Sequence, residues 1–401
     1  MIRKRLGPLG LALILFFLSM LMIGPLSEWW VKSYIKAGVI ETASENPIPS
    51  LFGGTLLQSA ALKDPHVHVV PIYGSSEFGH GGPYNPTKLF AGQPTGWTPY
   101  LVGHAGSVDL IQTLYAGAQN LKGRKIVLSL SAQWFSGNGV SQATFGANFS
   151  ALQAYKMIFN PALTLQTKQA LARRLIQFNE VKKTYPILDG FLNYYGQRDL
   201  KSLLLESVYW PAARVEMASL EIQDALKTVQ VIQHLPAGKI TDNSRSTAQK
   251  VLPTWSAMQE KATNDVRKNE TNNPFAVGNS FYSQRIKNLQ SLKNSATKGH
   301  FYPSPEYADL NLLMEVLKDE GADPIFLIQP VNGLWYDFTG FPKEQRQRYY
   351  SHVREMAKHF GFSLADFSTH EYDKYFMDDP SHPSEKGWLE FDEALDTFVQ
   401  Q

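Results

Sequence analysis

A long uncharged stretch near the N-terminus constrains the architecture of this chain more than any other feature. A basic cluster, Arg3 to Arg5, precedes a run from Leu6 to Leu26 that contains no charged residue. About 20 apolar residues are needed for a helix to cross the hydrocarbon core of a bilayer. The basic cluster should remain in the cytoplasm, and Trp29 and Trp30 suit the opposite interface. The run therefore predicts a transmembrane helix.

A cleaved signal peptide is the alternative interpretation of the same residues. It shares the basic start and apolar centre but needs small residues at its cleavage site, for which Gly24 to Ser27 is a weak candidate. The length of the run and the tryptophan pair after it favour an uncleaved anchor. We therefore predict a single-pass protein of the cell membrane, with an anchor over residues 1–30 and an extracytoplasmic body over residues 31–401.

The composition excludes several classes of function. The 401 residues carry a net charge of +2 and only 18% of them are charged, so the chain lacks the basic surface of a nucleic-acid binder. Cysteine is absent, which excludes disulfides, thiolate nucleophiles and cysteine-ligated zinc or iron–sulfur sites. The sequence also contains no Walker or dinucleotide-binding fingerprint. We expect no cofactor, no metal ion and no nucleic-acid partner.

Strand-like and helix-like segments alternate at both ends of the body. His66 to Tyr73 and Lys125 to Leu130 are short apolar runs typical of buried strands, and Val108 to Leu121 has apolar residues at helical spacing. This order indicates a parallel sheet and an α/β fold. The C-terminal block is expected to contain the helix Glu306 to Glu320, the strand Pro324 to Gln329, the helix Pro342 to Phe360, the strand Phe362 to Phe367 and the helix Ser384 to Val399.

The segment between these two blocks differs from them in pattern. Residues 146–299 are predicted to form a large, mostly helical insertion, with its clearest helical periodicity in Leu163 to Lys182 and Ala212 to His234. Within it, the polar stretch Asn264 to Asn273 is expected to be an exposed loop. Ahead of the first strand, Lys32 to Asp64 is expected to include a stalk.

A turn rich in serine follows the first predicted strand. Gly74, Ser75, Ser76 and Glu77 would lie at the carboxyl edge of the sheet, where open α/β folds bind their ligands. A serine nucleophile needs a histidine to accept its proton, and usually a carboxylate to orient that histidine. Taken alone, a Gly-Ser-Ser turn is more often only a turn.

A loop near the C-terminus offers both missing groups. Asp379 precedes His382 by three residues just before the last predicted helix. At that spacing the carboxylate can hold Nδ1 of the histidine, which leaves Nε2 free to face a serine. Separately, Asp379 suits a helix N-terminus and His382 a surface position. Together with the turn, they predict a triad of Ser76, His382 and Asp379, with a rate that rises through a pH of about 6.5.

These motifs resemble two nested groups of proteins. The SGNH, or GDSL-like, hydrolases carry Gly-Asp-Ser after the first strand and Asp-x-x-His before the last helix. The whole chain is more similar still to the DltD family of D-alanyl-lipoteichoic acid synthesis. The matching motifs are Gly74-Ser75-Ser76-Glu77-Phe78, Gln133-Trp134-Phe135, the segment Pro330 to Asp337, and Asp379-Pro380-Ser381-His382 with Lys386-Gly387-Trp388.

The resemblance implies a flavodoxin-like parallel sheet and roles for particular residues. Ser75 takes the position of the aspartate in Gly-Asp-Ser, so Ser76 matches the nucleophile and Ser75 is the alternative. The second and third blocks of the superfamily supply oxyanion donors, and they match Gly106 and Gln133 here. Gln133 replaces an asparagine, and Gly106 also suits a helix start.

The resemblance further implies a reaction and its partners. A serine acyl-enzyme at the outer membrane face would transfer D-alanyl groups from a donor to lipoteichoic acid, alongside a membrane acyltransferase and possibly an acyl carrier protein. Two alternatives stay open: an esterase or thioesterase that hydrolyses D-alanyl esters, and a non-catalytic scaffold of the D-alanylation machinery. Glu77 could bind the ammonium of an alanyl group or could be a solvated turn residue.

Overall fold

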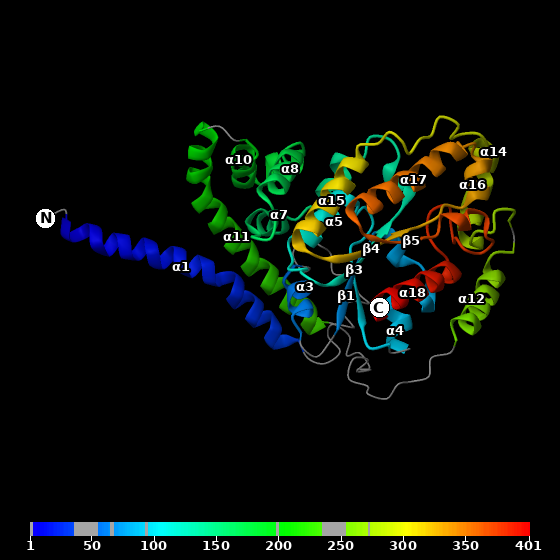
Figure 1. The fold of residues 1–401 in the computed structure, drawn as a ribbon, viewed down its shortest axis with the longest axis horizontal. Helices are drawn as coiled ribbons and strands as arrows, with labels where there is room; N and C mark the ends of the chain where they lie inside the picture. The colour runs from blue at the N-terminus through cyan, green and yellow to red at the C-terminus, as the bar shows by residue number, and fades with distance from the viewer. Residues whose placement is uncertain are drawn as a thin grey trace.

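A five-stranded parallel sheet with the order β2-β1-β3-β4-β5 lies at the centre of the body (Figure 1). Its strands are β1 (Val69–Tyr73), β2 (Thr98–Val102), β3 (Lys125–Leu130), β4 (Asp323–Ile328) and β5 (Ser363–Asp366). This is the strand order of flavodoxin-like folds, so the predicted α/β class is confirmed. The computed structural model describes residues 3–35, 55–64, 68–92, 95–197, 200–234, 254–271 and 273–401.

The strand sequences explain why the sheet is covered on both faces. In β3, Ile126 and Leu128 belong to one hydrophobic core, whereas Val127 between them belongs to the other. Phe326 and Leu327 of β4 divide in the same way. Parallel strands buried on both faces appear as continuous apolar runs, which is why these two strands could be recognised in the sequence.

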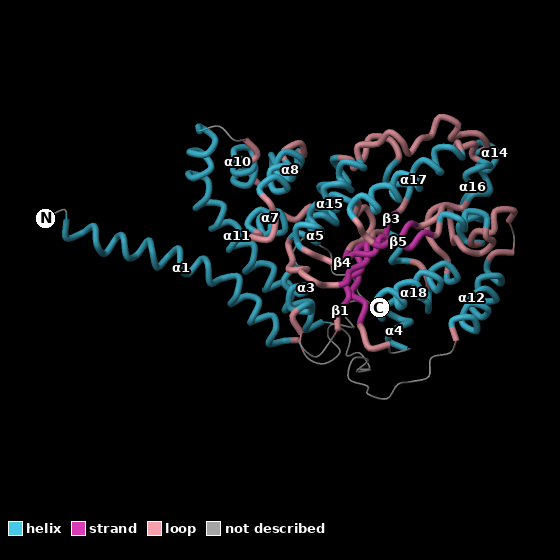
Figure 2. The backbone as a smooth tube through the Cα atoms, viewed as in Figure 1, coloured by secondary structure: helices cyan, strands magenta, loops and turns pink. Residues whose placement is uncertain are grey.

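Two helical layers enclose the sheet (Figure 2). One core is shared by α3 (Thr55–Leu62), α5 (Asp109–Gly117), α15 (Glu306–Glu320) and α17 (Lys343–Phe360). The other is shared by α4 (Pro86–Gly92) and α18 (Glu385–Gln400). Gly321 and Gly361 end α15 and α17 in the left-handed conformation, as their sequence positions predict.

The described part of residues 146–299 contains helices and no strand. With their neighbours at the edges, these helices are α6 (Gln142–Asn148), α7 (Ala151–Phe159), α8 (Leu165–Leu175), α9 (Asn179–Thr184), α10 (Pro186–Tyr195), α11 (Leu200–His234), α12 (Trp255–Asn269), α13 (Asn279–Arg285) and α14 (Leu289–Leu292). Helices α7 and α8 pack against α5 and α15, whereas α12 packs against α18. The segment therefore contributes to both faces of the sheet, and its status as a separate insertion stays a prediction.

The N-terminal helix α1 (Arg3–Tyr34) projects away from the body (Figure 1). Among the described residues it is the one helix long and apolar enough to cross a membrane, over Ile14–Tyr34. Leucines along it are exposed, whereas Ser27 and Val31 near its C-terminal end are buried against the body. These properties are compatible with a single-pass anchor.

Several local predictions were wrong or incomplete. The edge strand β2 was missed because it is short and contains Pro99, which edge strands tolerate. Asn264 to Asn273 was expected to be a loop, but most of it is the end of helix α12. Of the expected stalk, residues 32–34 end helix α1 and residues 55–62 form helix α3, whereas residues 36–54 lie outside the described residues. His66, at the start of the first predicted strand, is also outside them.

Candidate active site

The candidate residues lie where the chain leaves the carboxyl ends of neighbouring strands. Tyr73, the last residue of β1, pairs with Val102 at the end of β2 and with Leu128 near the end of β3. The chain crosses over in opposite directions from β1 and β3, so this edge is the topological switch point of the sheet. The turn after β1 begins here.

Close contacts shape the turn that follows β1. A β-carbon at Gly74 would lie 2.5 Å from Oε1 of Glu77 and from the Phe78 ring, so only glycine fits. A β-carbon at Gly103 would lie 2.1 Å from the Gly74 carbonyl oxygen, which also requires glycine. The turns after β1 and β2 are therefore packed directly against each other, and a short 3-10 helix (Ser76–Gly79) starts at the second serine.

The two serines of the turn make different contacts. The Ser75 hydroxyl is buried, donates to the carbonyl of His104 (3.2 Å) and accepts from the N–H of Gly106 (3.1 Å). The Ser76 hydroxyl instead lies 2.7 Å from Nε2 of His382. Ser75 thus links the turns after β1 and β2, and Ser76 is the serine that contacts the histidine.

The loop that carries His382 is held by the carboxylate of Asp379. Oδ1 of Asp379 accepts hydrogen bonds from the backbone N–H groups of Ser381 (2.8 Å) and His382 (2.9 Å). Oδ2 lies 2.7 Å from Nδ1 of the His382 ring. The N–H of Asn332 donates to the Pro380 carbonyl, which fixes the loop to the segment after β4. One carboxylate therefore orients both the loop and the ring.

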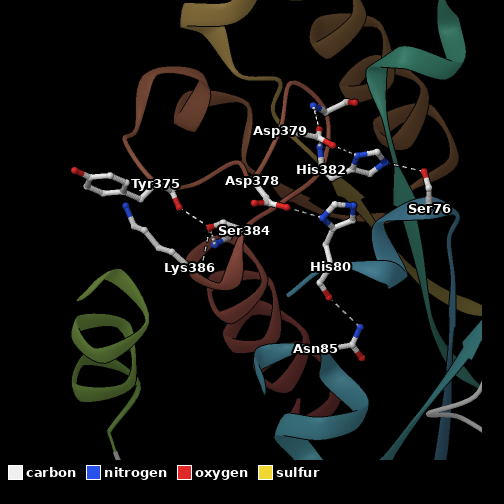
Figure 3. Close-up of polar contacts among 11 residues, drawn as sticks. Ser76, His80, Asn85, Tyr375, Asp378, Asp379, His382, Ser384 and Lys386 are labelled. Carbon is white, nitrogen blue, oxygen red and sulfur yellow. Dashed lines mark hydrogen bonds and ion pairs between the residues drawn. The ribbon is translucent and has the colours of Figure 1, made fainter. Parts of the chain in front are cut away.

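Ser76, His382 and Asp379 form a continuous hydrogen-bonded chain (Figure 3). Burial alone would lower the pKa of His382, but its hydrogen bond to Asp379 and the charges of Asp379, Glu77 and Asp378 outweigh burial, so this pKa is raised above 6.5. The pKa of Asp379 is lowered by the same hydrogen bond despite its burial. This geometry suits a serine activated by a histidine.

A second histidine–aspartate pair lies against the first, and the sequence analysis missed it. The His80 ring stacks on the His382 ring, with centroids 4.5 Å apart and planes 6° apart. Nδ1 of His80 lies 2.9 Å from Oδ2 of Asp378, as Figure 3 shows. Consecutive aspartates therefore each hold one of two stacked imidazoles. His80 lies between glycines, in the segment Gly79-His80-Gly81-Gly82, which has no strand or helix pattern of its own.

The same side chains are the one group of described residues whose arrangement could suit a metal ion. Ligand atoms of His80, Asp379 and His382 lie within 4.8 Å of one another. However, Nδ1 of His382 and Oδ2 of Asp379 already share a hydrogen bond, and Nε2 of His382 contacts Ser76. The donor atoms of Asp379 and His382 are thus already used within the hydrogen-bonded chain.

The two proposed oxyanion donors lie in the expected loops but differ in their contacts. Gly106 has φ 89°, which favours glycine, and its N–H already donates to Ser75. It lies before α5 rather than at its first residue, and a β-carbon there would crowd Thr144 and Asn148 of α6. Gln133 is half-buried in a 3-10 turn after β3, and its side chain makes no recorded hydrogen bond within the described chain.

Glu77 is not a solvated turn residue, because it is almost completely buried. Burial raises its pKa, and its Oε1 has no hydrogen-bond partner among the described residues. Its charge raises the pKa of His382, and its side chain occupies the space next to the α-carbon of Gly74. The buried Glu77 side chain therefore packs inside the turn and is not exposed to solvent.

An acidic pocket of about 210 Å³ opens on the far side of His80. Asp378, Glu270 and Glu385 line it, and no lysine or arginine is among its lining residues. Burial raises the pKa of Glu270 to about 9, and both of its carboxylate oxygens lack partners in the described structure. A protonated Glu270 can donate as well as accept hydrogen bonds, so the pocket suits a polar or cationic group.

Comparison with known proteins gives the family. Residues 47–400 match the family described as DltD protein. Protein DltD of Bacillus subtilis (strain 168) is 35% identical over 401 residues, which cover 99% of this chain and 98% of that protein. Protein DltD of Lacticaseibacillus rhamnosus is 28% identical over 403 residues, with 99% and 91% covered, and that of Staphylococcus aureus (strain NCTC 8325 / PS 47) is 26% identical over 370 residues, with 91% and 89% covered. The chain therefore belongs to the DltD family.

Proposed function

We propose that this protein transfers D-alanyl groups to lipoteichoic acid through an acyl-enzyme formed on Ser76. The observation that carries the proposal is the chain of two 2.7 Å contacts from Ser76 through His382 to Asp379. Family membership supports D-alanylation as the process and lipoteichoic acid as the acceptor. Asp378 and Glu385 line the pocket beside His80, and carboxylates there suit a substrate that carries an ammonium group.

The chemistry follows from the order of these groups. Nε2 of His382 accepts the Ser76 proton as Oγ attacks the carbonyl carbon of the D-alanyl donor, and Asp379 stabilises the imidazolium that forms. His382 then protonates the leaving group, and the D-alanyl ester of Ser76 remains. An acceptor hydroxyl gives its proton to His382 and attacks this ester. His382 then returns that proton to Oγ of Ser76 as the serine leaves, and the D-alanyl ester of the polymer is formed.

We further propose that α1 is an uncleaved anchor and that the body lies outside the cell. The basic residues at the N-terminal end of α1 favour the cytoplasmic side for that end. Ser27, the last residue of the weak cleavage candidate, and Val31 after it are buried against the body, so this stretch is part of the folded structure. A membrane acyltransferase and an acyl carrier protein are the partners expected for delivery of the alanyl group.

Covalent capture by a fluorophosphonate tests the nucleophile directly. The reagent should form a stable adduct that peptide mapping finds on Ser76, because its hydroxyl is the one that contacts His382. The adduct should disappear in His382→Ala. An adduct on Ser75, or equal labelling without His382, would contradict the proposed roles, and the lack of any adduct would favour a scaffold.

The pH dependence of this labelling reports the state of His382. Only the neutral imidazole can accept the Ser76 proton, and the pKa of His382 is raised above 6.5. The labelling rate should therefore be low in acid and rise with pH, with a midpoint above the 6.5 expected from the sequence alone. Second-order rate constants measured between pH 5 and pH 9 provide the check, and a midpoint at or below about 6.5 would argue against this environment.

A further inference from the structure

The long helix α11 turns aliphatic side chains away from the protein. Leu204 and Val208 are both 69% exposed, and Val215, Ile222 and Leu226 continue the row. At roughly 100° per residue, these five side chains point within about 40° of one direction. These five side chains form the outward face of α11. Monomeric soluble proteins rarely expose a contiguous apolar row of this kind.

Four charged side chains of the same helix contact the protein, whereas Lys227 is exposed to solvent. The guanidinium of Arg214 lies 3.7 Å from the ring centre of Phe159, Glu216 accepts a hydrogen bond from Tyr155, Glu221 pairs with Lys156 at 2.8 Å, and Asp224 accepts from the N–H of Leu56 at 2.8 Å. A helix on a water-exposed surface shows the opposite arrangement, with its charges outward and its apolar stripe inward. Helix α11 therefore turns these four charged side chains toward the protein and its row of aliphatic side chains away from it.

Helix α11 also packs against the proposed anchor. A β-carbon at Gly24 of α1 would lie 2.7 Å from a carboxylate oxygen of Glu221, so the two helices approach closely at this glycine. Figure 1 shows α11 running obliquely beside α1, with its N-terminal end on the side of the molecule toward which α1 projects. Ile222 of the outward face follows Glu221 in α11, and the exposed Leu21, Met22 and Leu26 of the anchor flank Gly24.

We propose that the outward face of α11 rests in the outer leaflet of the membrane, with its aliphatic side chains in contact with lipid. The inference rests on the proposed insertion of α1. Helix–helix contacts in membranes favour small residues, and the α1–α11 contact uses them at Gly24, whereas the outward face consists of large aliphatic residues that suit lipid. Burial of these side chains adds a second attachment beside the anchor.

The absence of cysteine allows a direct test in the full-length protein. Single substitutions Val208→Cys and Ile222→Cys on the outward face are each labelled with a polarity-sensitive fluorophore after reconstitution into phosphatidylglycerol vesicles. Gln223→Cys is the matched control, because Gln223 is exposed on the same helix about 100° away from Ile222. Leu15→Cys reports insertion of α1, where Leu15 is 55% exposed.

Nitroxide-bearing lipid should remove at least about half of the fluorescence at 208, 222 and 15, whereas iodide in the buffer should quench position 223 preferentially. Iodide quenching at 208 and 222 with lipid quenching at 15 would overturn the lipid contact and leave the anchor in place. Protection of 208 and 222 from both quenchers would mean that protein covers the face, which also overturns the proposal. Iodide quenching at position 15 would show that α1 is not inserted in the membrane, which would overturn the premise of the inference. Fluorophosphonate capture at Ser76 tests catalysis independently of this result.

Discussion

Replacement of Ser76 by alanine should lower the D-alanine content of lipoteichoic acid to that of cells without the protein. The Ser76 hydroxyl is the one in contact with Nε2 of His382, so its removal leaves no nucleophile in that position. Loss of a serine nucleophile in a triad lowers the rate by roughly 10⁴-fold or more. The measurement is ester-linked D-alanine on purified lipoteichoic acid, together with free D-alanine in the medium.

Ser75→Ala is the matched control for this experiment. It removes a hydroxyl from the neighbouring residue but leaves the contact of Ser76 with His382. The N–H of Gly106 would lose its acceptor, so a loss of stability of about 1–3 kcal/mol is expected while activity persists. Normal levels of both polymer-bound and free D-alanine in Ser76→Ala would refute the enzyme and favour the scaffold. Loss of polymer-bound D-alanine together with free D-alanine would favour transfer, whereas loss of free D-alanine alone would favour hydrolysis.

Replacement of Asp379 by asparagine should lower the rate of Ser76 acylation by about 10⁴-fold with little change in stability. An asparagine Oδ1 can still accept from the N–H groups of Ser381 and His382, so the loop is kept. Its amide nitrogen, however, donates where Oδ2 accepted, and this favours the imidazole tautomer with the proton on Nε2. That tautomer cannot accept the Ser76 proton. Burst kinetics with an activated D-alanyl ester provide the measurement.

Thermal unfolding distinguishes this effect from misfolding. Asp379→Asn should unfold within a few degrees of the parent, whereas Asp379→Ala loses two backbone hydrogen bonds as well and should be less stable. An asparagine variant that keeps activity within about tenfold of the parent would show that Asp379 does not set the tautomer.

The central fold could be predicted from sequence because its strongest signals are local. The runs 125–130 and 324–329 are apolar on both faces, and Gly321 and Gly361 mark helix ends by their conformation. The edge strand β2 has no such signal. Its sequence includes a proline, and it pairs with only one described strand, β1. The position of β2 depends on its pairing with β1, and residues 98–102 alone do not indicate this pairing.

The candidate site was predictable only where roles follow from chain order. Asp379 and His382 share one loop, so their contact could be inferred from spacing. His80 could not be found in this way, because its partner Asp378 is 298 residues away and the stacking depends on the folded sheet edge. The different contacts of Ser75 and Ser76 likewise depend on another loop, because Ser75 bonds to His104 and Gly106 there. These contacts join segments that are distant in the sequence, so neighbouring residues alone do not predict them.

The span of 306 residues between Ser76 and His382 has a consequence for the newly made protein. On the proposed mechanism, the turn that carries the nucleophile is synthesised well before its base, which lies just before α18. A nascent chain that has not yet emerged beyond His382 would therefore carry a serine without its base. Acylation of Ser76 in this proposal begins only after His382 has been added and the sheet edge has folded, so a chain truncated before His382 would not react with a D-alanyl donor.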